Sequence, residues 1–408
     1  MTLPMPMPRP PQALRQHLMR SVLARLAASV AGAWDNPSYA SGAAGHLLAM
    51  AVLAERCPHA RLDVALMEDC VQRLLGAIPQ LEHGLYQGAE GVMYAALELD
   101  RHFGFGLAQD AACDFDDYLH DCLRHERDLP YRFDLISGIS GLAVYAGYRA
   151  RQGADPAALH AALDRLGAMA SRDERGASWF TPPAWVHGLP MGQAYPLGCV
   201  DMGVAHGQAG VLATLGYALA GMPAPHAGAR ALLTEALAFL RHHEHTGQKS
   251  HFGVVAGDAD AARCAWCYGD LGMAGALRLA AAALAAPALD DWADRLLHSM
   301  RRRPLGELGF VDPWLCHGSA GAGWLLRQLG GDSADLADMA AACDALHLHE
   351  DAGGVVARLE QAPQLSLLEG MAGVALACAH VDGRPPALHW SLPLLAGRNA
   401  LAPPIHPR

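Results

Sequence analysis

The sequence predicts an all-α protein in which seven helical hairpins close into an α/α toroid, with a small irregular or β-like insertion. Three observations predict this fold: a repeated Gly-x-x-Gly unit, an apolar helix-forming run after each unit, and amphipathic segments between the units. Of the 408 residues, 52% are hydrophobic and only 17% are charged. The chain can therefore bury a large core, and its composition is not that of a disordered protein.

The Gly-x-x-Gly units recur at intervals that leave room for two helices and their loops. Glycines before an apolar helix let a loop approach closely and turn sharply before the chain enters the interior. The amphipathic segments, such as residues 227–241 and 289–302, suit an outer layer. A closed ring leaves no terminal repeat with an exposed apolar face, in contrast to an open solenoid. The units are Gly42 and Gly45, Gly88 and Gly91, Gly138 and Gly141, Gly207 and Gly210, Gly269 and Gly272, Gly318 and Gly321, and Gly370 and Gly373.

Residues 13–401 are predicted to form a single toroid domain. The longest interval between units contains residues 177–199, where Trp, Tyr and Pro make poor helix sequence, and we expect the insertion there. The proline-rich residues 1–12 and 402–408 are expected to be flexible.

Composition also excludes several classes of protein. A net charge of −11 argues against nucleic-acid binding, which needs a basic face. No apolar run approaches the roughly 20 residues of a membrane helix, and the N-terminus lacks a signal-peptide core. The ten cysteines are scattered along a long chain, which favours reduced thiols in a cytoplasm over a disulfide framework.

The residue directly before the first glycine is polar in every repeat, although apolar helices follow. In a closed ring, these equivalent positions converge on the mouth of the central axis. The column consists of Ser41, Gln87, Ser137, His206, Tyr268, His317 and Glu369.

A zinc site is predicted from the fifth and sixth repeats. Cys267 and Cys316 both lie two residues before the first glycine, and His317 follows Cys316. A single buried cysteine is usually inert packing. Matching positions in neighbouring repeats instead favour metal binding. Two thiolates and an imidazole suit Zn²⁺, and three protein ligands leave a fourth position open, as a catalytic site requires. We expect one zinc ion per chain.

Four motifs resemble, in order and spacing, the LanC-like lanthipeptide (lanthionine) cyclases. They are Tyr-Arg-Phe-Asp134-Leu-Ile-Ser-Gly-Ile-Ser-Gly, Met-Gly-Val-Ala-His206-Gly-Gln-Ala-Gly, Trp-Cys267-Tyr-Gly and Cys316-His317-Gly. The similarity extends over nearly the whole chain, from Gly42 to Gly373. The resemblance implies a seven-fold α/α toroid with zinc on Cys267, Cys316 and His317, and with Asp134, His206, Arg263 and Tyr268 in the active site. No dehydratase portion precedes the repeats, so a stand-alone enzyme of class I type is expected.

The resemblance implies a cyclase that adds peptide cysteine thiolates to dehydroalanine or dehydrobutyrine, forming the (methyl)lanthionine thioether rings of lanthipeptides such as bacteriocins. In that reaction His206 is the expected acid and Arg263 the group that stabilises the enolate. Asp134 is expected to orient or handle protons, and Tyr268 to share proton delivery or hold the zinc-site geometry. The expected partners are a dehydrated precursor peptide, a separate dehydratase and an exporter, in the cytoplasm or at the periphery of a membrane-associated biosynthetic complex.

One departure from the family pattern is Cys264, where an acidic residue commonly follows the arginine. This thiol is a bystander, a substitute ligand or a redox liability. Other functions stay open: a non-catalytic LanC-like protein that binds peptides or glutathione, or another toroid zinc enzyme that alkylates thiols, such as a prenyltransferase. A toroid glycosidase would need two facing acids and no zinc, which the zinc set disfavours.

Overall fold

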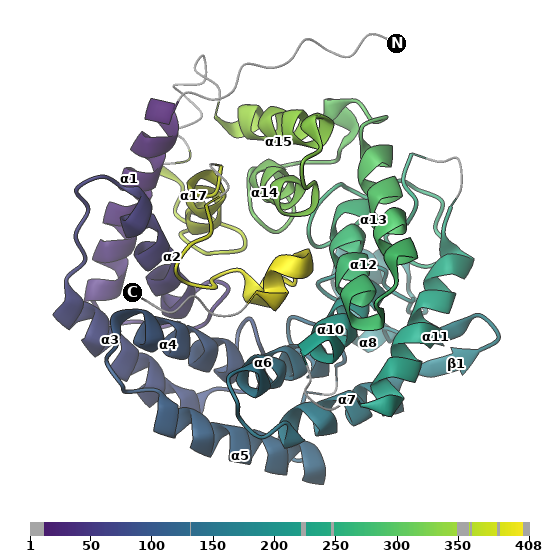
Figure 1. The fold of residues 1–408 in the computed structure, drawn as a ribbon, viewed down its shortest axis with the longest axis horizontal. Helices are drawn as coiled ribbons and strands as arrows, with labels where there is room; N and C mark the ends of the chain where they lie inside the picture. Colours follow the sequence, from purple (N-terminus) through teal and green to yellow (C-terminus); the bar gives the residue numbers. More distant parts are fainter. Residues whose placement is uncertain are drawn as a thin grey trace. The chain divides into compact units, whose positions relative to one another are not determined.

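The computed structural model describes residues 12–402, except 131, 222–225, 246–248, 349–358, 360 and 382–383. Helices dominate the described residues, as predicted (Figure 1). The chain forms two compact units, each built from segments that are distant in sequence. The first unit comprises residues 1–116, 304–394 and 402–408, and the second comprises residues 117–303 and 395–401. The expected flexible termini, residues 1–12 and 402–408, lie outside the described part apart from Gln12 and Ala402.

In the first unit, α2 packs against α1, α4 and α17, and α14 packs against α15 and α17 (Figure 1). The C-terminal helix α17 therefore joins the start of the chain to the α14–α15 hairpin, which makes this unit discontinuous in sequence. The helices of the first unit are α1 (Gln12–Ala31), α2 (Ala43–Arg56), α3 (Val64–Ala77), α4 (Ala89–Phe103), α14 (Ser319–Leu329), α15 (Ala334–His347) and α17 (Met371–Ala379). Helix α5 (Gln109–His125) contains the boundary between the two units.

In the second unit, α10 packs against α6, α11 and α12, while α13 covers α12. The short 3₁₀ helix η5 (Gly397–Leu401) contacts α10 and α12, which brings the end of the chain into this unit. The helices of the second unit are α6 (Ile139–Arg151), α7 (Ala157–Met169), α8 (Pro183–Val186), α9 (Pro190–Ala194), α10 (Gln208–Gly221), α11 (Ala227–His243), α12 (Asp270–Leu284) and α13 (Pro287–Met300).

Every Gly-x-x-Gly unit precedes a helix, as predicted. A helix begins directly after the first glycine of each unit, and these helices are α2, α4, α6, α10, α12, α14 and α17. These helices are largely buried. Backbone carbonyls of the preceding loop satisfy the first amides of most of them. The Ala43 amide donates to Asn36 at 3.0 Å, and the Ile139 amide to Arg132 at 2.9 Å. Each acceptor carbonyl lies seven residues before its donor.

The two glycines of a unit are needed because this loop passes directly over the helix start. A Cβ on Gly42 would meet the Asn36 carbonyl, and a Cβ on Gly45 would meet the Tyr39 carbonyl. The fifth loop adds a second requirement, since Gly269 has φ +90°, a conformation that side chains disfavour. The sequence pattern thus reflects close backbone approach at each helix N-terminus.

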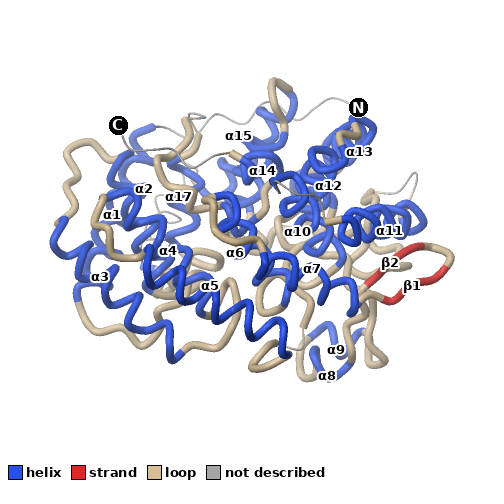
Figure 2. Tube along the Cα trace, turned by 60° about the horizontal axis from the view of Figure 1, so that its bottom comes forward, coloured by secondary structure: helices blue, strands red, loops and turns tan. Residues whose placement is uncertain are grey.

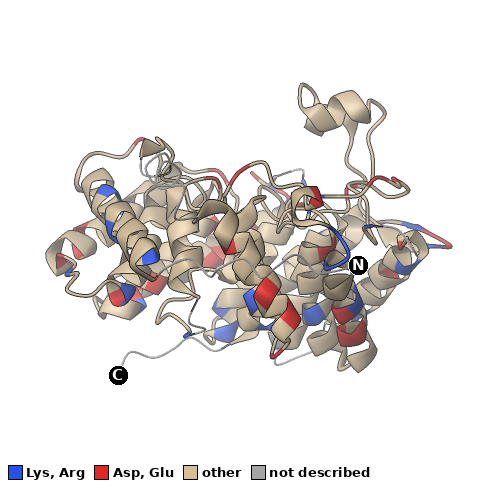
Figure 3. Cartoon of the chain, turned by 90° about the horizontal axis from the view of Figure 1, so that it is seen from above, with Lys and Arg blue, Asp and Glu red and all other residues tan. Residues whose placement is uncertain are grey.

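The insertion is irregular, as predicted, but begins earlier than residue 177. The antiparallel hairpin β1 (Ser171–Asp173) and β2 (Gly176–Ser178) precedes α8 and α9 (Figure 2). An isolated bridge between Thr181 and Cys199 closes the base of the segment. The β-like character was predicted, but the position of the hairpin was not, because its strands are three residues long and largely polar, so no alternating pattern marks them. Residues 177–200 carry no Asp, Glu, Lys or Arg, whereas charges of both signs are interspersed along the helices (Figure 3).

Candidate active site

The loops before α6 and α10 bring two predicted residues together. His206 Nδ1 lies 3.4 Å from the Asp134 carboxylate oxygen Oδ2. Asp134 is buried, with 3% of its side chain exposed, and its other oxygen accepts a hydrogen bond from the Ser137 amide at 2.7 Å. The His206 side chain is 46% exposed. A fixed carboxylate therefore orients an imidazole whose other nitrogen is available to a ligand.

The surroundings of His206 favour its protonated form. Loss of hydration alone would lower its pKa, but the hydrogen bond and charge of Asp134, with the charge of Asp201, more than offset this effect. The nearby Arg132 guanidinium opposes the two carboxylates. The net result is a His206 pKa above the usual 6.5. A histidine of this kind is suited to donate a proton near neutral pH.

Tyr268 is held by a residue that the sequence analysis missed. Its hydroxyl donates to Asp201 Oδ2 at 2.6 Å, and Asp201 Oδ1 accepts from the Gly203 amide at 2.7 Å. Burial and the adjacent Asp201 carboxylate raise the Tyr268 pKa, and burial raises the Asp201 pKa. A phenol with a raised pKa, already donating to a carboxylate, is a weak proton donor. The structure therefore favours a role for Tyr268 in holding the zinc-site geometry over a role in proton delivery.

A signal for Asp201 was present in the sequence. Asp201 lies six residues before the first glycine of its repeat, and Asn36 and Asp312 occupy the same position in theirs. In all three, the side chain accepts a hydrogen bond from the backbone amide two residues later. Such local bonds are typical of Asn and Asp in turns, so this column was recognisable.

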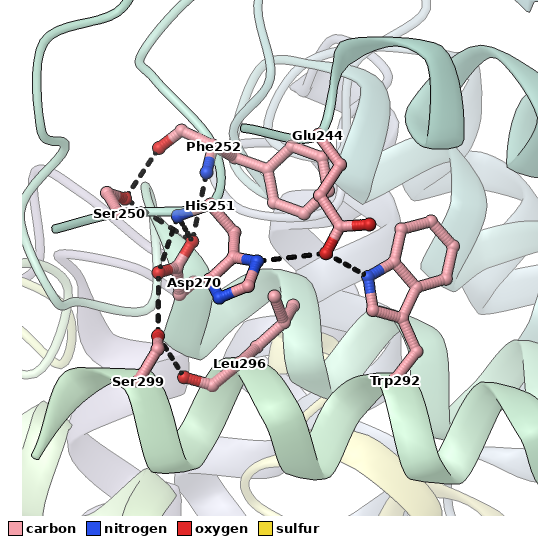
Figure 4. A network of polar contacts seen from close by, with 8 residues as sticks. All are labelled: Glu244, Ser250, His251, Phe252, Asp270, Trp292, Leu296 and Ser299. Carbon is pink, nitrogen blue, oxygen red and sulfur yellow. Dashed lines mark hydrogen bonds and ion pairs between the residues drawn. The ribbon is translucent and has the colours of Figure 1, made fainter. Parts of the chain in front are cut away.

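The start of α12, next to Cys267 and Tyr268, is fixed by a buried carboxylate (Figure 4). Asp270 accepts from the backbone amides of His251 and Phe252, and from the hydroxyls of Ser250 and Ser299. Burial raises the Asp270 pKa, and the hydrogen bonds that it accepts, together with the nearby His251, oppose this effect. The network ties the 250–252 segment and α13 to the first residue of α12.

Cys264 has a definite place in the second unit. The thiol is buried, and its sulfur lies 3.0 Å from Arg303 Nη1. Burial raises the Cys264 pKa to about 12, although Arg303 opposes the shift. The contact with Arg303 gives this thiol a hydrogen-bonding partner within the second unit. The structure thus shows Cys264 in contact with Arg303, and its part in metal binding or redox chemistry stays a prediction.

In the first unit, carboxylates flank the predicted ligand His317. Asp312 Oδ2 lies 3.2 Å from Nδ1, and Glu369 Oε1 lies 3.6 Å from Nε2. Cys316 is buried, and its amide donates to the Leu368 carbonyl at 3.0 Å. A cavity of about 550 Å³ opens beside the imidazole, lined by Ser41, His46, Trp314, His317, Pro363, Gln364, Leu365, Ser366 and Glu369.

The three predicted zinc ligands are divided between the two units, with Cys267 in the second and Cys316 and His317 in the first. Within either unit, the described residues contain no group of three or more His, Cys, Asp or Glu side chains placed to hold a metal ion. The donor chemistry nevertheless suits zinc. Both thiols are buried, no disulfide joins any of the ten cysteines, all of which are described, and a carboxylate accompanies the imidazole as in many zinc sites.

Arg263 is half-buried in the loop before α12. Among the described residues of the second unit, none makes a hydrogen bond or ion pair with its guanidinium. The four predicted catalytic residues thus lie in the loops at the starts of α6, α10 and α12; they are Asp134, His206, Arg263 and Tyr268. Two side-chain contacts are formed there, one between His206 and Asp134 and one between Tyr268 and Asp201.

Comparisons with known proteins agree with the resemblance. Residues 33–385 match the family model described as "Lanthionine synthetase C-like protein". The nisin biosynthesis protein NisC of Lactococcus lactis subsp. lactis is 33% identical over 143 residues, which are 32% of this chain and 33% of that protein. This match therefore spans about a third of NisC. None of the described helices is long and apolar enough to span a membrane.

The structure of a nisin cyclase is similar to this one, with a TM-score of 0.75 and 19% identity over 93% of this chain and 97% of that one. Similarity at that identity shows a shared fold, and it confirms the predicted fold class, an all-α LanC-like α/α toroid. Because the family model spans most of its length, the chain belongs to the lanthionine synthetase C-like protein family.

Proposed function

We propose that the protein is a zinc-dependent lanthionine cyclase, which closes thioether rings in a dehydrated precursor peptide. The observation that carries the proposal is the His206–Asp134 pair, a half-exposed imidazole with a raised pKa oriented by a buried carboxylate. This pair supplies a positioned acid in a chain of the lanthionine synthetase C-like family. A ring-closing addition to a dehydroamino acid needs such an acid.

Cys267, Cys316 and His317 would hold one zinc ion, whose chemistry when bound is to favour deprotonation of a thiol near neutral pH. The proposal rests on the donor set and on the repeat positions of these residues. Asp312 would fix the orientation of the His317 ring, as carboxylates do for many metal-binding histidines.

The proposed reaction forms one carbon–sulfur bond and moves one proton. The thiolate sulfur of a peptide cysteine adds to the β-carbon of dehydroalanine or dehydrobutyrine, and the double-bond electrons become an enolate at the adjacent carbonyl. Arg263 stabilises that negative charge, and His206 delivers a proton to the α-carbon. Asp134 orients His206, while Asp201 holds Tyr268 in place. The thiol proton is released to solvent, and His206 regains a proton from solvent after each addition, so the mass of the peptide does not change.

The substrate is proposed to be a dehydrated precursor peptide, modified beforehand by a separate dehydratase and passed on to an exporter. A cytoplasmic enzyme, or one at the periphery of a membrane-associated biosynthetic complex, would suit this sequence of reactions.

The proposal is tested with purified protein and a dehydrated peptide that carries an unprotected cysteine. Ring closure consumes a thiol, so we expect the number of alkylatable thiols, counted by mass spectrometry, to fall faster than without protein. Fragmentation and chiral analysis must show one ring pattern and one stereochemistry, because spontaneous addition gives the same mass. Tight peptide binding with no acceleration would instead support a non-catalytic peptide-binding protein.

Asp134→Asn is expected to move the pH dependence of cyclisation to lower pH. The acid form of His206 is lost as pH rises through its pKa, and Asp134 is the main group that raises this pKa. Asparagine removes the charge but can still accept the Ser137 amide through Oδ1. The alkaline fall in rate should therefore begin at lower pH in Asp134→Asn than in the wild type. An unchanged pH profile would show that His206 is not the acid.

A further inference from the structure

We propose that Arg303 is a positioning residue, which fixes the backbone on both sides of Arg263 and so aims the Arg263 guanidinium at the reacting peptide. The effect on catalysis rests on the proposed function. The contacts of Arg303 with Ala262 and Cys264 are observed in the second unit and do not depend on that function.

The contacts of Arg303 bracket Arg263. Arg303 Nη1 donates to the Ala262 carbonyl at 2.8 Å and to the Cys264 sulfur at 3.0 Å. Ala262 and Cys264 are the two chain neighbours of Arg263, and both are buried. Arg303 is itself only 8% exposed, although burying a guanidinium is costly. One buried guanidinium thus holds the loop on both sides of Arg263.

The guanidinium of Arg263, in contrast to that of Arg303, is not held by the surrounding loop. Arg263 is half-buried, and within the described residues of the second unit its guanidinium has no hydrogen-bond or ion-pair partner. The loop around it is also closed at its C-terminal side, where the Ala265 amide donates to the Tyr268 carbonyl at 3.2 Å. An arginine with a fixed backbone and an unengaged head is suited to bind an anion, here the enolate oxygen. Cys264 then serves as one of the two acceptors that hold the loop.

The first arm of the test measures the contact without using activity. In Arg303→Met, the Ala265 amide is expected to exchange its hydrogen faster than in the wild type by on the order of tenfold, because the loop opens more often. The Ser137 amide, bonded to Asp134 in the loop before α6, is the internal control and should not change. Equal exchange at Ala265 in both proteins would overturn the proposal, whether or not the protein is a cyclase.

The second arm asks whether the contact acts through Arg263. We expect Arg303→Met to lower kcat by on the order of tenfold with little change in KM, since small misplacements of catalytic groups have effects of this size. In an Arg263→Met background, the same change should cause no further loss. Losses that multiply in the double variant would show that Arg303 only supports the fold, and would overturn the proposal.

Two further variants separate positioning from stability. Arg278 pairs with Asp290 and Asp294 in the same unit, so Arg278→Met is a matched loss of a structural arginine. It should lower the thermal midpoint and leave kcat unchanged. Should Arg303→Met fail to fold, Cys264→Ala removes only one acceptor, and a kcat loss of roughly two- to threefold that disappears in the Arg263→Met background is expected. No kcat loss in Cys264→Ala would count against the two-point contact.

Discussion

Cys316→Ala is expected to purify without zinc and to close rings no faster than the uncatalysed reaction. Removing one of three protein ligands leaves a donor set that holds zinc weakly, and the thiol of the substrate then stays largely protonated at neutral pH, because a free cysteine has a pKa of roughly 8.5. Metal analysis of the purified protein, run beside the ring-closure assay, measures both effects. Zinc affinity of the wild type should also fall in acid, because the ligands must lose protons to bind.

The matched control for this variant is Cys264→Ala. Cys264 is also buried and lies only three residues from Cys267, but its sulfur contacts Arg303. It should keep one zinc per chain. Full zinc occupancy in Cys316→Ala, or an active wild type that contains no metal, would rule out the proposed zinc site. Loss of zinc in Cys264→Ala would instead show that Cys264 is a ligand.

His206→Ala is expected to keep its zinc and lose most of its productive cyclisation. His206 lies outside the proposed ligand set, and its nearest charged neighbour is Asp134 in the preceding repeat. Without the imidazole, the enolate lacks a positioned proton donor, and general acid assistance typically contributes about 10² to 10⁴ in rate. Thiol alkylation followed by mass spectrometry counts the rings, and metal analysis shows whether the two functions separate.

The control for His206→Ala is His242→Ala, a substitution on α11 that should change neither zinc content nor rate. Wild-type cyclisation in His206→Ala would make the histidine structural. Its raised pKa would then reflect only the ion pair with Asp134. Loss of zinc would show that the ligand set is incomplete.

The sequence predicted the features of this chain that repeat. Gly42, Gly138 and Gly370 each precede a buried helix because the same close backbone approach recurs at each helix start, and a recurring steric need leaves a recurring residue. The His206 and Asp134 motifs were likewise recognisable, and the structure places those two side chains in contact.

Single contacts between segments distant in sequence could not be predicted in the same way. The Arg303–Cys264 contact joins residues 39 positions apart, and no periodicity marks either of them. The Tyr268–Asp201 pair spans 67 positions, and only the turn chemistry of Asp201 gave a local signal. The zinc site stays a prediction, since Cys267 belongs to one unit and Cys316 to the other.

In the loops that precede the seven Gly-x-x-Gly helices, different residues determine the backbone path and the chemistry. Backbone carbonyls and glycines determine the path of each loop, while the side chain before the first glycine is buried in none of the seven repeats. Gln87 and His206 therefore occupy equivalent exposed positions, although one carries an amide and the other the imidazole of the proposed acid. Exchanging the side chain at such a position alters reactivity with little loss of stability. A scaffold of this kind is well suited to acquire new reactions by single substitutions.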